Sequence, residues 1–84
     1  MKVIAVYDKK AISYMPPMFA PNRVSAVRMF ERSINSDPER SDLARFPADY
    51  NLQELGEFDE VTGTFKLHVN PIVLHEAMEF VQAE

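Results

Sequence analysis

The sequence contains no cysteine, and it has only two glycines and two histidines. Without cysteine there is no disulfide to stabilise the fold, no thiolate ligand for a metal and no thiol nucleophile. The two glycines, Gly56 and Gly63, are too few to build a phosphate-binding loop. His68 and His75 have no second ligand at a spacing typical of metal sites. We therefore expect neither a metal nor a cofactor.

No arrangement of residues typical of a catalytic site is present either. The serines lack the glycine-flanked turn that exposes a nucleophile in hydrolases. The adjacent carboxylates Asp59 and Glu60 fall in a predicted hairpin turn, where acidic residues are common for structural reasons. The sequence therefore predicts a protein that is not an enzyme.

Long apolar runs are also missing, because the strand-like run at residues 3–7 is too short for a signal core or a membrane span. We expect the protein to act inside the cell that makes it, without membrane contact. Its 84 residues predict one domain, residues 1–84, with limited capacity to bury a core. Hydrophobic residues make up 46% of this short chain, a generous share that favours a homodimer.

Basic residues are scarce in the second half of the chain. Residues 1–45 contain eight basic and five acidic residues, whereas residues 46–84 contain one basic and eight acidic residues. The net charge of −4 argues against a general nucleic-acid coat protein. The asymmetry predicts either one basic and one acidic face or a surface on which both signs mix after folding.

The predicted elements follow from apolar spacing and from capping residues. Residues 2–7 form a strand, residues 8–21 a loop, and a helix begins after the capping residue Asn22. Asp37 and Pro38 open a short helical turn that ends near Arg45. Two strands, residues 50–58 and 64–69, flank a hairpin loop at residues 59–63, and Asn70 and Pro71 open a last helix.

This order, β-α-(short α)-β-β-α, predicts an α+β fold with a small antiparallel or mixed sheet and helices on one face. The first strand is apolar on both sides and is expected at the centre. Leu55 breaks the alternation of its strand, so either it points outward to a partner or a bulge near Gly56 shifts the register. A second copy on the uncovered sheet face would account for Leu55 and for the apolar excess.

The segment at residues 7–22 combines lysines, aromatic residues and three prolines. A loop stiffened by proline holds large side chains at low entropic cost, which suits a contact surface. Cations beside aromatic rings are the means by which single-stranded nucleic acid is bound without sequence preference. The predicted nucleic-acid site comprises Lys9, Lys10, Arg23, Arg28, Arg32, Tyr7, Tyr14 and Phe19.

A structural interpretation of the same segment stands beside this one. Tyr14, Met15, Met18 and Phe19 could instead cover the core or pack against a second subunit. Met15 and Met18, together with Leu55, are accordingly the predicted partner or dimer interface.

Several blocks of the sequence resemble the small nonstructural protein of gokushoviruses, the tailless single-stranded DNA bacteriophages of the microvirus group. The resemblance spans nearly the whole chain, and the more specific blocks are residues 7–30 and 46–59. It implies a nonstructural protein of the infected bacterial cytoplasm that acts in genome replication or packaging. No catalytic residue is implied.

Two functional hypotheses follow. In the first, the protein binds single-stranded DNA or the replication complex, with the cations on phosphates and the rings stacked on bases. In the second, it is a protein-interaction module that engages a phage or host replication protein without touching nucleic acid.

Overall fold

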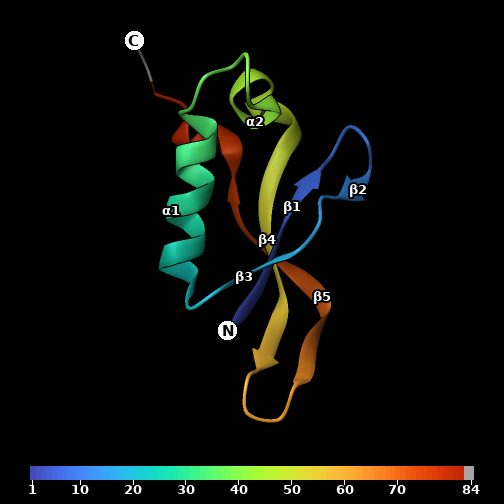
Figure 1. Cartoon of the computed structure of the whole chain (residues 1–84). Coiled ribbons are helices and arrows are strands. Elements are labelled where there is room, and N and C mark those ends of the chain that lie inside the picture. Colours follow the sequence, from blue (N-terminus) through green and yellow to red (C-terminus); the bar gives the residue numbers. More distant parts are fainter. Residues whose placement is uncertain (83–84) are drawn as a thin grey trace.

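The apolar segment at the N-terminus forms strand β1 (Lys2–Asp8), which lies inside a five-stranded antiparallel sheet. The computed structural model describes residues 1–82. Val3, Ile4, Ala5 and Val6 are all buried, as expected for a central strand of the sheet. The sheet has the order β2-β1-β4-β5, and β3 also pairs with β1, on the edge used by β2 (Figure 1).

The expected loop at residues 8–21 was wrong, because it contains two short strands that fold back on β1. These are β2 (Ser13–Tyr14) and β3 (Met18–Ala20), which pair with opposite ends of β1. The Met15 amide donates to the Val6 carbonyl at 2.8 Å. Pro16 and Pro17 have no amide hydrogen to pair, so the ladder is interrupted between the two short strands.

Helix α1 (Arg23–Ile34) begins where the sequence predicts it. The Asn22 side chain accepts a hydrogen bond from the Ser25 amide at 2.9 Å and so caps the first turn. Ala26, Phe30 and Ile34 recur at four-residue spacing and are buried against the sheet. The predicted helix is therefore confirmed, although Val24, which the apolar spacing also assigns to the buried stripe, is 62% exposed.

The short helical segment begins later than expected. Helix α2 (Asp42–Arg45) is capped by Ser41, whose side chain accepts from the Ala44 amide, and the 3₁₀ turn η1 (Pro47–Asp49) follows. The Asp37 carboxylate instead accepts from the Glu39 amide in the preceding turn.

Strand β4 (Tyr50–Asp59) and strand β5 (Thr64–Glu76) form a long hairpin that projects beyond the helices (Figure 1). Gly63 closes its turn at a φ of 71°, a conformation that favours glycine. The predicted last helix from Asn70 was wrong: β5 continues to Glu76, and only the 3₁₀ turn η2 (Ala77–Phe80) follows. Asn-Pro is a good helix start, but Ile72 and Val73 pair with β4, and this tertiary pairing overrides the local signal.

A bulge interrupts the hairpin at Leu55. Glu54 pairs with Ile72 but Gly56 pairs with Leu67, so Leu55 lies opposite residues 68–71. The register between β1 and β4 shifts at the same place. Of the two explanations for the broken alternation, the bulge is thus confirmed. It also places Gly56 and Phe58 on the face opposite Tyr50 and Leu52, whereas an unbroken alternation of this strand would have put all four on one face.

The core lies between one face of the sheet and the helices. Ile4, Val6, Tyr50 and Leu52 from the sheet pack against α1, α2 and η2. The α+β class with helices on one face is therefore confirmed, although the order of elements differs. Within residues 1–82, no helix has both the length and the apolar character needed to cross a membrane.

Candidate functional site

The sheet face opposite the helices is the most distinctive surface of the molecule. Side chains alternate along each strand, so Val3, Ala5 and Tyr7 of β1 point away from the core that holds Ile4 and Val6. The paired strands add further side chains to this side. We call this surface the aromatic face, and it comprises Tyr7, Tyr14, Phe19, Asn51, Gln53, Phe58, Phe65, Leu67 and Val73.

Three phenylalanine rings form one cluster on the aromatic face. The Phe58 centroid lies 4.9 Å from that of Phe65 and 5.5 Å from that of Phe19, and the Phe19 and Phe65 centroids are 6.2 Å apart. Such tilted contacts fix the rings relative to one another. Phe19 is nevertheless 47% exposed and Phe65 56% exposed. Large rings that are both held in place and accessible are typical of contact surfaces.

A polar network occupies the other end of the same face. The Tyr14 hydroxyl donates to Gln53 at 2.8 Å, and the Gln53 amide donates to Asn51 at 3.0 Å. Asn51 and Lys9 both donate to the Glu76 carboxylate, at 3.0 and 2.6 Å. The Lys9 ammonium, more than any other group, lowers the pKa of Glu76. The charges at this end are thus paired with each other.

On the helix side of the sheet, Glu54 is a buried carboxylate that is 1% exposed. Arg23 donates two hydrogen bonds to it, at 2.8 and 3.1 Å. The His68 imidazole lies 2.7 Å from its second oxygen, and Lys2 lies 3.7 Å from the first. The Arg23 hydrogen bond is the largest cause of a Glu54 pKa of about 2, with His68 and Lys2 acting in the same direction. This arrangement ties α1 to β4 and β5.

The predicted nucleic-acid site is not assembled as one surface. Tyr7 and Tyr14 do lie together, with ring centroids 4.7 Å apart, and Phe19 lies on the same face. The cations do not converge on them: Lys9 pairs with Glu76, and Arg23 pairs with Glu54. Lys10 is exposed in the turn before β2.

Arg28 and Arg32 are exposed on α1, which covers the opposite side of the sheet. The predicted aromatic residues therefore lie on one surface, whereas the predicted lysines and arginines are dispersed.

The three residues predicted at a partner interface differ in their surroundings. Met18 packs against the core beside Val6, so its side chain is a core element. Met15 is exposed next to the two prolines, and Leu55 is half-buried in the bulge. Met15 and Leu55 thus remain available for contact.

Four side chains of interest were not singled out from the sequence: Gln53, Glu54, Phe58 and Phe65. The alternation of Phe65, Leu67 and Val69 is typical of a strand with one buried side, yet these residues are 56, 61 and 97% exposed. The pattern reports that one side is apolar but not what covers it. The alternation of apolar residues in this strand was therefore the signal available in the sequence.

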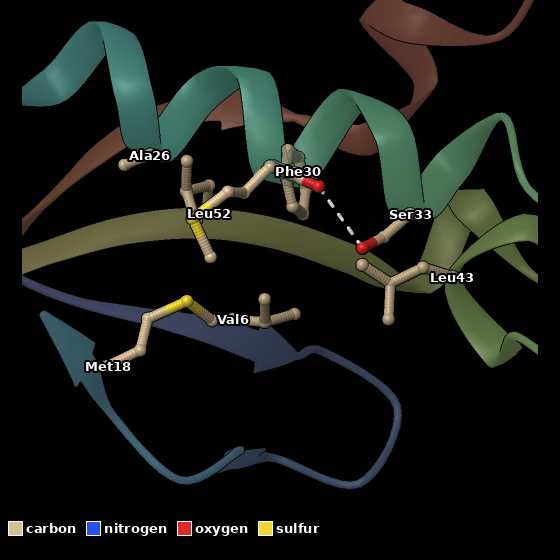
Figure 2. A pocket seen from close by; sticks show the side chains of 8 residues that line it. Val6, Met18, Ala26, Phe30, Ser33, Leu43 and Leu52 are labelled. Carbon is tan, nitrogen blue, oxygen red and sulfur yellow. Dashed lines mark hydrogen bonds between the residues drawn. The ribbon is translucent and has the colours of Figure 1, made fainter. Parts of the chain in front are cut away.

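A small apolar cavity lies between α1 and the sheet (Figure 2). Its volume is about 60 Å³, and Met18, Met29 and Leu43 are among its walls. The Ser33 hydroxyl at its edge donates to the Met29 carbonyl at 3.1 Å, so this polar group is already satisfied. Sites for small molecules usually have volumes of roughly 300 Å³ or more. The cavity is therefore a packing gap beside the core.

Among residues 1–82, no three histidine or carboxylate side chains come together in a way that could hold a metal ion. The aromatic face thus remains the candidate site, and the chemistry it offers is non-covalent contact through rings and aliphatic side chains.

Comparison with known proteins gives a family for this fold and surface. Neither the curated proteins nor the solved structures include a match to the chain. The family model described as Phage ORF5 protein matches residues 1–80, which is almost the whole sequence. The chain therefore belongs to the Phage ORF5 protein family.

Proposed function

We propose that this phage protein is a non-enzymatic accessory factor in the replication or packaging of a single-stranded DNA genome. The phage family supports the general context, and the sequence blocks at residues 7–30 and 46–59 support the gokushovirus group. In that setting the protein acts in the cytoplasm of the infected bacterium, where it binds a component of the replication or packaging complex.

The aromatic face supports protein contact as the mode of action. Phe19, Phe65 and Leu67 offer exposed rings and aliphatic surface on one side of the sheet. Aromatic residues are enriched and charges depleted at the centres of protein interfaces. The ion pair of Lys9 and Glu76 lies at one end, where a polar rim would be expected. The partner we propose is a phage or host replication protein with a complementary apolar surface.

Direct binding of single-stranded DNA is the second candidate, and the rings are the observation that favours it. Rings on neighbouring strands can act as a platform on which unpaired bases stack. Phosphate binding, however, needs cations beside the rings, and Lys9 and Arg23 are paired with carboxylates. DNA binding by this face would therefore be weak and strongly dependent on salt.

Affinity capture from infected cells tests the proposal. Tagged wild-type protein should retain a phage-encoded or host replication protein after the lysate is treated with nuclease. Phe19→Ala should lose this partner, because Phe19 is 47% exposed within the ring cluster. Val24→Ala is the matched control, since Val24 is 62% exposed on α1, across the sheet from the rings.

Fluorescence anisotropy with a labelled oligonucleotide separates the two candidates. The protein-contact proposal predicts little binding at low salt and no effect of Phe19→Ala. Tight binding that is lost both with Phe19→Ala and at high salt would replace the first candidate with the second. Equal capture of the protein partner by Phe19→Ala and wild type would remove the aromatic face from the proposal.

A further inference from the structure

The outer edge of β5 is an exposed strand edge in the projecting hairpin (Figure 1). Residues 64–69 are exposed except for the half-buried His68, and among residues 1–82 no strand pairs with their outer side. Phe65, Leu67 and Val69 occupy alternate positions on this edge, and Val69 is 97% exposed. A free edge with an apolar side is a template for pairing with another strand.

We propose that a second copy of this chain pairs with this edge, so that β5 lies antiparallel to β5 about a two-fold axis at Leu67. In this register Leu67 faces its own counterpart and Phe65 faces the Val69 of the second copy. Lys66 faces the second His68, which is hydrogen-bonded to the Glu54 carboxylate at 2.7 Å. In this register apolar side chains face apolar side chains and the two copies of Lys66 stay apart, as a two-fold interface requires.

Charge favours a second copy over a charged partner. Lys66 is the only lysine, arginine or carboxylate residue at positions 64–69, and among residues 1–82 it forms no ion pair. A two-fold contact tolerates this single cation, because the axis at Leu67 places it opposite His68 and not opposite another lysine. An acidic or basic partner would find no matching set of charges along the edge.

The size of the contact sets its strength. The contact is limited to one strand edge at residues 64–69, so it is expected to be smaller than the roughly 1,600 Å² that a standard stable interface buries in total, and the dimer to be weak. Pro71 has no amide hydrogen, which limits the extent of pairing toward the bulge. The opposite edge of the sheet carries only the short strands β2 and β3 with Pro16 and Pro17 between them. The association therefore ends at a dimer.

This pairing goes beyond the proposed function, and because it joins strand edges it leaves the sheet face that carries Phe19 and Phe58 uncovered. A two-fold axis perpendicular to the sheet places both aromatic faces on the same side of one continuous sheet. The dimer would then present two copies of the ring cluster to a partner, which raises apparent affinity through multivalency. Phe65 and Leu67 belong to both the paired edge and the aromatic face, whereas Phe19 lies on β3, away from that edge. The dimer is therefore tested at Leu67 by its association, and the partner contact is tested separately at Phe19 by capture.

Sedimentation equilibrium over a micromolar concentration series tests the dimer. Wild-type protein should dimerise, whereas Leu67→Lys places two lysines opposite each other and should raise the dissociation constant by roughly tenfold or more. Val61→Lys is the matched control, because Val61 is 94% exposed in the hairpin turn outside the paired edge. It makes the same change in charge and should leave the dimer intact.

A mixing experiment tests the register independently of folding defects. Leu67→Lys and Leu67→Glu should each be monomeric, and an equimolar mixture should form a heterodimer. A monomeric wild type, or a Leu67→Lys protein that dimerises normally, would overturn the proposal. So would two monomeric variants that fail to associate when mixed, or a dimer broken by Phe19→Lys but unchanged by Leu67→Lys.

Discussion

At the scale of single residues, Gly56 marks a close approach of β4 and β5. A Cβ atom at this position would clash with the Lys66 carbonyl oxygen and lie 2.7 Å from the Leu67 Cα. Both are backbone atoms of the paired strand, so neither can move aside as the tip of a side chain could. Glycine is thus required by its missing side chain, next to the bulge at Leu55.

Gly56→Ala should lower the free energy of unfolding by about 2 kcal/mol or more, because the strands must separate locally. Gly63→Ala is the comparison: a Cβ atom there would have no neighbour within 4 Å, but the φ of 71° is unfavourable for alanine. We expect a loss of about 1 kcal/mol there. Urea unfolding measures both values. An equal or smaller loss for Gly56→Ala would contradict the close approach of the strands.

Glu54 gives the protein a specific acid sensitivity. Its pKa of about 2 lies below the ordinary value of 4.5, so the ionised carboxylate stabilises the folded state above pH 4.5. This contribution, roughly 3 kcal/mol at most, is lost as the pH falls from about 4.5 toward 2. Glu54→Gln should therefore be less stable than wild type at pH 7, by a smaller margin at pH 3, and close to it at pH 2. A difference that stays constant with pH would contradict the role of the charge.

At the scale of elements, α1 shows how far local signals reach. Asn22, the apolar stripe and the helix bounds could all be predicted, because capping and periodicity act within a few residues. Asn22→Ala should cost about 1 kcal/mol of stability, and Asn22→Ser should retain most of it, since serine also accepts from the Ser25 amide. Thermal unfolding measures both. No loss with alanine would contradict the cap.

The C-terminal elements show where local signals fail. Asn70 and Pro71 predict a helix, but Ile72 and Val73 gain more from pairing with β4 than a short helix could offer. The pairing of β2 and β3 with β1 could not be predicted from the sequence for the same reason, since strand pairing depends on distant residues. The aromatic face was only half predicted. Its tyrosines and Phe19 were singled out, but the lysines and arginines predicted to lie beside them pair with carboxylates or lie on other surfaces.

Hydrogen exchange checks the state of residues 72–76. Their amides that pair with β4 should be protected together with those of β4, because the two strands open as one unit. Carbon chemical shifts should be those of a strand. Helical shifts at Ile72 and Val73, or exchange independent of β4, would contradict the extended β5.

At the scale of the whole molecule, ion pairs join the basic first half of the sequence to its acidic second half. Cations of the first half pair with carboxylates of the second: Lys2 with Glu57, Lys9 with Glu76, and Arg23 with Glu54. The two signs therefore mix at these positions and do not form a single cationic surface. What remains distinct is the aromatic face, which carries rings and apolar side chains. The helices cover the opposite side of the sheet (Figure 1).

Photocrosslinking in infected cells tests most directly whether the aromatic face is the contact surface. A benzophenone analogue of phenylalanine replaces Phe19 in one protein and Val24 on α1 in another. The account predicts a crosslink from position 19 to a phage or host replication protein, and none to that protein from position 24. Crosslinks to that protein from position 24 alone, or from position 19 only to DNA, would contradict it.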